Sequence, residues 1–240
     1  MATYRAVMDV VERLRAAQAA PGLDDAAVDR LRAAYPVPLP SELTDLLRRT
    51  TGVPRLGLDL TGAGLGLPRH GALATLLPAA HPVLGDAAGN RWVLDLTPDT
   101  VDAAPVFFVG HDRPVLLHQA GDLTTFVAEV IDADRAEPGA SALDAVREDR
   151  LHDVWGTRPG AVPVAQALAG DQALRDFAGS LDEGWTVVDL RARTVGQGLV
   201  WARYGPQTRV ARHGWERIFA YAPYEPPRRS WRRFGRTRRV

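Results

Sequence analysis

Hydrophobic residues in the middle of the chain follow the two-residue period of a β-strand. In the segment 91–96 every second residue is apolar, and Val93 and Asp95 stand between these residues on the opposite face. The apolar set is Trp92, Leu94 and Leu96. Thr97-Pro98-Asp99 ends the run, because proline cannot donate a ladder hydrogen bond. The pattern predicts a strand with one face in a core.

Two further apolar runs and one amphipathic stretch follow. Residues 105–110 are apolar on both faces, as in a strand that is covered on each side, and 115–119 come after a connection of hairpin length. Asp122 is a residue type that caps helix N-termini, and the apolar residues behind it recur with helical spacing. They are Leu123, Phe126, Val127, Val130 and Ile131. This unit is predicted to be a short antiparallel sheet closed by one helix.

Three helices are predicted ahead of this sheet. The first spans 3–19, the second begins at Asp24-Asp25, and the third covers 41–51 and ends at Gly52 as a left-handed stop. The segment 53–90 is rich in glycine and proline, which favours short strands and loops.

A second α+β unit is predicted in the last third of the chain. A helix near 162–181 precedes four apolar runs separated by turn residues, which is typical of a β-meander. The four runs are 185–191, 199–204, 208–212 and 215–221. The expected fold class is α+β, with the chain divided into a domain at 1–135, a linker at 136–160, a helix-plus-meander region at 161–222 and a tail at 223–240.

Composition excludes several classes of protein. The 240 residues contain no cysteine, so disulfides, thiolate metal sites and cysteine nucleophiles are excluded. No apolar run approaches the length of about 18 residues that a membrane-spanning helix needs, and the N-terminus lacks a signal-peptide core. A cytoplasmic protein is therefore expected. The basic residues are all arginine, which we attribute to high-GC coding.

Charge is distributed unevenly although the net charge is zero. Residues 223–240 hold seven arginines and one glutamate, so an acidic body carries a basic tail. The tail residues of interest are Arg228, Arg229, Trp231, Arg232, Arg233 and Phe234. Such residues bind phosphates and stack on bases, bind anionic lipid, or contact the acidic body of the same chain. The alternative is a disordered tail that only aids solubility.

Catalytic and metal-binding patterns are weak. His111-Asp112 resembles a base with its orienting acid, but no nucleophile is near it in sequence and Asp-x-Pro is ordinary turn chemistry. Asp95, Asp99 and Asp102 suggest a cation site, yet their spacing is not that of a calcium loop, and the turn at Thr97-Pro98-Asp99 is the favoured explanation. The six histidines lack zinc-ligand spacing, and no serine lies in a G-x-S-x-G elbow. We expect no enzyme activity, no metal and no cofactor.

Four motifs together resemble the SUKH superfamily, which includes the yeast cell-wall-synthesis and killer-toxin-resistance regulator. They are LPSELTDLLRRTTGV at 39–53, GNRWVLDL at 89–96, PVFFVGHD at 105–112 and DLTTFVAEVI at 122–131. The resemblance covers about residues 1–135 and departs from the family where Thr51 replaces the usual asparagine. It implies a non-enzymatic binding module, since many bacterial members are thought to be immunity proteins that neutralise toxins. It also implies that Gly89, Trp92 and Asp95 determine the fold.

Two functions remain open from the sequence. In the first, an immunity-type or adaptor protein binds a protein partner, such as a basic toxin domain, through exposed acidic residues on the open sheet face and its loops. The residues expected to bind are Asp95, Asp99, Asp102 and Asp112. In the second, a nucleic-acid-associated or regulatory protein acts through the arginine-rich tail.

Overall fold

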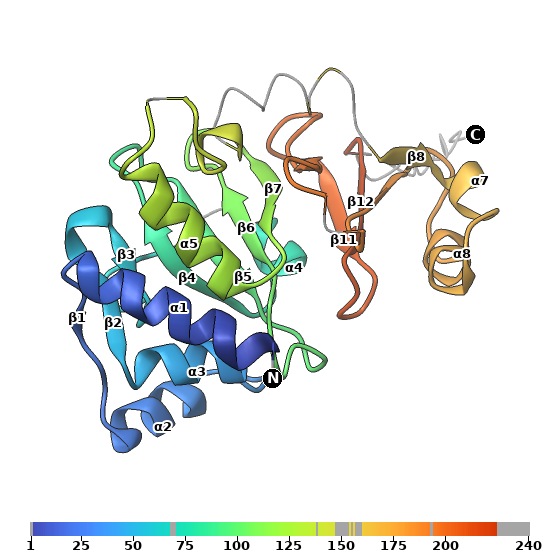
Figure 1. Cartoon of the computed structure of the whole chain (residues 1–240). Helices are drawn as coiled ribbons and strands as arrows, with labels where there is room; N and C mark the ends of the chain where they lie inside the picture. Colours follow the sequence, from blue (N-terminus) through green and yellow to red (C-terminus); the bar gives the residue numbers. More distant parts are fainter. Residues whose placement is uncertain are drawn as a thin grey trace, which may run out of the picture.

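A computed structural model shows the chain as an α+β protein, which confirms the expected fold class. It describes residues 2–67, 71–137, 139–146, 154, 156, 160–192 and 194–224. Four layers follow one another, namely helices, a large sheet, a smaller sheet and a second set of helices (Figure 1). Among the described residues, no helix is long and apolar enough to cross a membrane.

The large sheet contains eight described strands, and all neighbours are antiparallel. Their order is β1-β2-β3-β4-β5-β6-β7-β10. The strands are β1 (Ala20–Pro21), β2 (Thr50–Val53), β3 (Leu58–Asp59), β4 (Ala80–Gly85), β5 (Arg91–Asp95), β6 (Val106–Val109), β7 (Val115–Ala120) and β10 (Gly198–Val200). A short 3-10 helix, η1 (Pro54–Leu56), lies between β2 and β3.

Helices cover one face of the large sheet. They are α3 (Ser41–Leu47) and α5 (Leu123–Ala133), which contact its strands, α1 (Ala2–Ala16), which packs on both of these helices, and α2 (Asp25–Ala33), whose Val28 joins the same core. The predicted stripe of α5 is buried, together with Trp92 and Leu94 of β5, in one core. Asp24 and Asp122 cap α2 and α5, since their carboxylates accept bonds of 2.7 Å from the N–H groups of Ala27 and Thr125.

The other face of the large sheet is covered by the C-terminal part of the chain. This smaller sheet has the order β11-β12-β9-β8 in the described residues. Its strands are β8 (Ala161–Pro163), β9 (Thr186–Asp189), β11 (Arg209–Arg212) and β12 (Ile218–Ala222). Val93 and Phe107 of the large sheet pack against Val188 and Phe219 of the smaller one. The alternation that placed Val93 opposite Trp92 is therefore confirmed, but the face that carries Val93 is not open.

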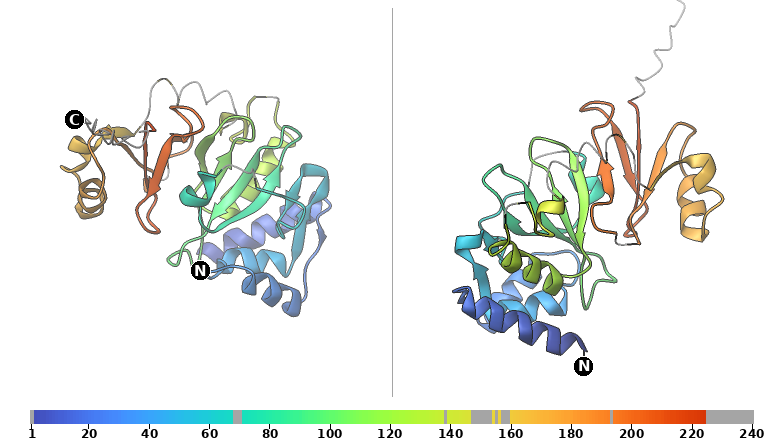
Figure 2. Two further views of the ribbon diagram at one scale, coloured as in Figure 1. Left: turned by 180° about the vertical axis from the view of Figure 1, so that it is seen from behind. Right: turned by 45° about the horizontal axis from the view of Figure 1, so that its top comes forward.

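Short helices complete the layers. The one-turn helix α4 (Leu73–Leu76) lies beside β11, between the two sheets, and α7 (Val164–Ala167) and α8 (Gln172–Gly179) cover the outer face of the smaller sheet (Figure 2). The single helix predicted near 162–181 is thus two helices. Asp171 begins the second one, because its carboxylate accepts a bond of 3.0 Å from the N–H of Leu174.

The predicted β-meander is wrong at one strand. β10, expected between its neighbours in the C-terminal unit, instead pairs with β7 and forms an edge of the large sheet. Gly198 permits this pairing, because a Cβ at that position would lie 1.8 Å from the carbonyl oxygen of Leu116. The segment 161–222 therefore contributes to both sheets.

Two other boundaries differ from those predicted. The third helix ends at Leu47 instead of residue 51, and Gly52 lies in β2 with φ 130°, where a Cβ would meet the carbonyl of Leu58 at 2.2 Å. The predicted linker contains a 3-10 helix, η2 (Asp144–Val146), and its residues Val146 and Val154 join the core under the large sheet. The first core thus extends past residue 135.

Candidate functional site

The four acidic residues predicted to bind a partner lie in three different environments. Asp95 is fully buried, at 0 % exposure, whereas Asp99, Asp102 and Asp112 are exposed. Asp99 and Asp102 belong to the connection between β5 and β6, and Asp112 belongs to the connection between β6 and β7. Consecutive connections in an antiparallel sheet lie at opposite ends of its strands. The structure therefore brings together only Asp99 and Asp102.

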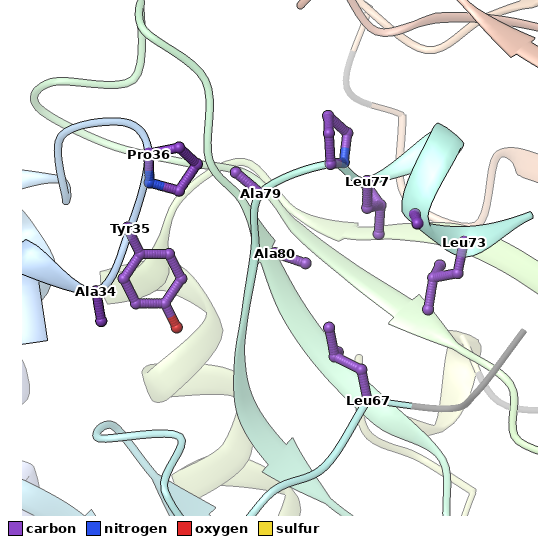
Figure 3. A pocket seen from close by; sticks show the side chains of 10 residues that line it. Ala34, Tyr35, Pro36, Leu67, Leu73, Leu77, Ala79 and Ala80 are labelled. Carbon is purple, nitrogen blue, oxygen red and sulfur yellow. The ribbon is translucent and has the colours of Figure 1, made fainter. Parts of the chain in front are cut away.

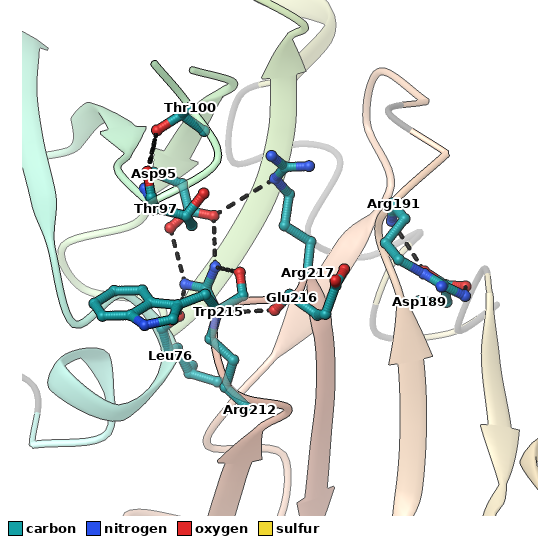
Figure 4. A network of polar contacts seen from close by, with 10 residues as sticks. All are labelled: Leu76, Asp95, Thr97, Thr100, Asp189, Arg191, Arg212, Trp215, Glu216 and Arg217. Atoms are coloured by element: carbon teal, nitrogen blue, oxygen red, sulfur yellow. Dashed lines mark hydrogen bonds and ion pairs between the residues drawn. The ribbon is translucent and has the colours of Figure 1, made fainter. Parts of the chain in front are cut away.

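The prediction that Asp95 lies on an open sheet face is wrong. Its carboxylate accepts hydrogen bonds of 2.8 and 2.9 Å from the two terminal nitrogens of Arg212 in β11, and Arg217 forms an ion pair with it at 3.7 Å (Figure 4). The smaller sheet covers this end of β5 and excludes water from the carboxylate. Burial raises the pKa of Asp95, and the charges of the two arginines oppose that shift.

The Arg212 guanidinium is fully used inside the molecule. Besides Asp95, it donates to the carbonyl oxygens of Leu76 in α4, of Trp215 and of Glu216, at 2.8 to 2.9 Å. Its side chain is 2 % exposed. This cluster fixes α4, β5 and the turn after β11 to one another, so we assign it to the connection between the layers and not to binding.

The loop that carries Asp99 and Asp102 is held in one conformation. The Thr100 hydroxyl accepts a bond of 3.0 Å from the Thr97 N–H and donates one of 2.7 Å to the Thr97 carbonyl. The first N–H groups of α3 also hold the loop. The Ser41 N–H donates to the Val101 carbonyl at 2.8 Å, and the Glu42 N–H donates to the Asp102 carbonyl at 3.3 Å. The loop thus presents Val101, which is 54 % exposed, between two carboxylates. We call residues 99–102 the acidic loop.

A pocket of about 420 Å³ opens where β4 begins. Its walls are the segment after α2 on one side and the segment containing α4 on the other (Figure 3). Most of the described residues that line it are alanine, proline and leucine, and Tyr35 is the polar one among them. The lining includes Tyr35, Leu67, Leu73, Ala74, Ala79 and Ala80.

Tyr35 is hydrogen-bonded to a buried histidine behind the pocket wall. Its hydroxyl lies 2.6 Å from Nδ1 of His81, and Nε2 of His81 lies 2.9 Å from the carbonyl oxygen of Leu60. His81 is 0 % exposed, and this burial lowers its pKa. Burial also raises the pKa of Tyr35. Both side chains are therefore neutral at pH 7.

The remaining predicted residues that the structure describes form no second site. His111 and Asp112 are hydrogen-bonded to each other at 2.8 Å on the surface. In the described part of the chain, no group of three His, Cys, Asp or Glu side chains is close enough to hold a metal ion. The predicted tail residues, from Arg228 to Phe234, lie outside the described residues.

Sequence reasoning missed Arg212, Tyr35 and His81. Arg212 lies on the same strand face as Val210, which points inward. Asp95 likewise lies on the covered face of its strand. Two opposite charges at inward strand positions are a signal that could have paired them. No such signal links Tyr35 with His81, which are 46 residues apart.

Comparisons with known proteins give no match. No family model, no curated protein and no solved structure matches this chain.

Proposed function

We propose that this chain is a non-enzymatic protein-binding module, of immunity or adaptor type, that binds a basic partner through the acidic loop. The observation that supports this best is Val101, an exposed apolar residue between Asp99 and Asp102 on a loop fixed to α3. Protein interfaces commonly have an apolar centre with a polar rim. A partner with arginine or lysine around an apolar contact fits this surface.

Charge supports the same partner. Residues 1–135 contain 17 aspartates and glutamates against 12 arginines, so the N-terminal part of the chain is net acidic. A negative surface raises the association rate of a positively charged partner and disfavours acidic competitors. Because the acidic loop is already ordered, little conformational entropy is lost when the partner binds.

The resemblance of residues 1–135 to the SUKH superfamily supports the biological class. The immunity role of bacterial members of that superfamily suggests a toxin domain as the partner. A basic toxin domain, such as that of a nuclease, has the charge that the acidic loop requires. In this proposal the partner, and not a substrate, occupies the surface around the acidic loop.

The test is capture of the partner from native lysate with the immobilised full chain, followed by association kinetics with the identified protein. The double variant Asp99→Asn, Asp102→Asn removes both charges without changing side-chain size. It is expected to lower the association rate constant at least several-fold at low salt and to flatten its salt dependence. The matched control is Asp182→Asn, Glu183→Gln, which removes two exposed charges from the C-terminal unit.

An equal effect of both double variants contradicts the acidic loop as the binding surface. Loss of binding only in Asp112→Asn places the interface at the opposite end of the sheet. Capture of nucleic acid alone, lost when Arg232 and Arg233 are replaced by Gln, contradicts the protein-binding proposal and favours the tail.

A further inference from the structure

Among the described residues that line the pocket, Tyr35 has the only polar side chain, and the other side chains are apolar. The Tyr35 ring forms the wall that faces Leu67 and Leu73 across the opening (Figure 3). Leu73 belongs to α4, which is held in place from behind by the Arg212 bond to the Leu76 carbonyl. This bond fixes the α4 wall, and the contact between the Tyr35 hydroxyl and His81 fixes the opposite wall.

The hydrogen bonds behind the wall determine what Tyr35 offers to a ligand. A backbone carbonyl only accepts, so the 2.9 Å contact with the Leu60 oxygen places the proton of neutral His81 on Nε2. Nδ1 of His81 is then an acceptor, and the Tyr35 hydroxyl must donate its proton to it across 2.6 Å. The Tyr35 oxygen consequently keeps a lone pair, and no proton, for a second partner.

The pocket and the acidic loop lie at the same end of the large sheet. Ala80 of the pocket pairs with Asp95 at the end of β5, and the Ala79 carbonyl accepts a bond of 2.9 Å from the N–H of Leu96. The acidic loop begins three residues after Leu96. A protein segment that places one side chain in the pocket therefore approaches the end of the sheet from which the acidic loop extends.

We propose that this pocket receives a tryptophan side chain of the basic partner, a statement that rests on the function proposed above. Indole is an apolar body with one N–H donor and no acceptor, which matches apolar walls and a lone pair on Tyr35. Phenylalanine or leucine leaves the Tyr35 lone pair without a donor, and a lysine or arginine loses its hydration against apolar walls. Tryptophan, with tyrosine and arginine, is also one of the residue types enriched at interface hot spots.

The direct test uses N-acetyl-tryptophanamide as a probe of the isotopically labelled full chain, with amide chemical shifts as the readout. Saturable shifts are expected at Tyr35, Leu73, Ala74 and Ala80. N-acetyl-phenylalaninamide is expected to bind about fivefold more weakly, because it lacks the donor. Tyr35→Phe removes the acceptor and should reduce the difference between the two probes to less than twofold.

A second variant tests the volume of the pocket without touching Tyr35. Ala74 is exposed at the rim on α4, so Ala74→Trp adds a ring over the opening at little cost to the core. This variant is expected to abolish the shifts. No saturable binding of the tryptophan probe, shifts away from these residues, or unchanged discrimination in Tyr35→Phe would overturn the proposal.

The same measurement tests two other possible occupants of the pocket. Tighter binding of N-acetyl-tyrosinamide than of the tryptophan probe overturns the assignment to tryptophan. Tighter binding of the tryptophan probe to the full-length Trp231→Ala variant means that the chain's own tail fills the pocket, which overturns the assignment to a partner. The double variant Asp99→Asn, Asp102→Asn should leave probe binding unchanged. The pocket proposal and the acidic-loop proposal can therefore be contradicted independently of each other.

Discussion

Arg212 and Asp95 form a buried, two-pronged ion pair between residues 117 positions apart in the chain. The pair joins β5 of the large sheet to β11 of the smaller one across an interface that is otherwise lined by the apolar residues of the second core. Because the guanidinium has acceptors for all its donors, the charge is buried without unpaired groups.

The first prediction concerns the loss of one partner of this pair. Asp95→Ala leaves the Arg212 charge buried without its counter-charge, and we expect the free energy of unfolding to fall by about 3–5 kcal/mol. Urea unfolding followed by tryptophan fluorescence measures this change. Asp25→Ala, which removes an exposed ion pair with Arg48, is the control and is expected to cost less than about 1 kcal/mol.

Replacement of both partners separates charge burial from packing. Asp95→Leu with Arg212→Met removes both buried charges, so the double variant is expected to recover at least half of the stability lost by Asp95→Ala. A double variant as unstable as the single one would mean that the bonds from Arg212 to the Leu76, Trp215 and Glu216 carbonyls, and not the pair with Asp95, hold the two sheets together.

The second prediction is a pH dependence that arises from His81. Its pKa is lowered by burial, so the unfolded chain binds this proton more readily than the folded chain. The stability contributed by neutral His81 is complete above the ordinary histidine pKa of about 6.5 and declines as the pH falls below it, by up to about 1.4 kcal/mol per pH unit. Urea unfolding at pH 7.5, 6.5 and 5.5 measures the slope.

His81→Gln is the test variant, because glutamine can still donate to the Leu60 carbonyl and accept from Tyr35. It should flatten the slope between pH 6.5 and 5.5. His111→Gln, which replaces an exposed histidine, is the matched control. Parallel slopes for the natural chain and His81→Gln would show that another group causes the acid sensitivity.

The third prediction concerns Glu42, which is buried and accepts bonds from the N–H groups of Leu123 and Thr124 at the start of α5. Burial raises the pKa of Glu42, and the bonds from Thr124 oppose the shift. Glu42→Gln turns an amide donor toward one of these N–H groups, so we expect a loss of about 1–3 kcal/mol. Chemical unfolding measures it, with Glu12→Gln, at an exposed position of α1, as the unchanged control. Equal stability of both variants would contradict a capping role.

The fourth prediction concerns the close approach of β10 to β7. Gly198→Ala places a methyl group against the Leu116 carbonyl and should cost about 1–3 kcal/mol. The amide hydrogens of His118 and Trp201, which bond across this pair to Gln197 and Pro114, should exchange faster. Gly179→Ala is the control, because a Cβ there meets nothing within 4 Å. Unchanged exchange at Trp201 would mean that β10 is held by packing alone.

Local signals in the sequence were sufficient for the elements of the centre. Asp122, the helical spacing behind it and the alternation around Trp92 predicted α5 and β5 within a few residues, because each depends on neighbours in the sequence. The place of β10 was not predictable in this way. Its short apolar run is equally compatible with either sheet, and the choice depends on Gly198 meeting Leu116 across the layers.

The candidate site shows the same limit. Asp99 and Asp102 were expected on a loop and lie on one, since Thr97-Pro98-Asp99 is turn chemistry in any context. Asp95 has the same charge and lies four residues earlier, but a strand from the far end of the chain covers it. Exposure is a property of the assembled layers, so alternation alone could not separate Asp95 from its neighbours.

The position of β10 also affects how the chain is made. The residues up to Ala120 leave the ribosome long before Gly198 follows. Until then β7 has an unpaired edge, and the sheet face of Val93, Phe107 and Leu116 is in water. Open strand edges and apolar faces lead to aggregation of nascent chains. A product of premature termination before Gly198 is therefore a substrate for chaperones or for aggregation, even though nearly all of its helix-covered core is present.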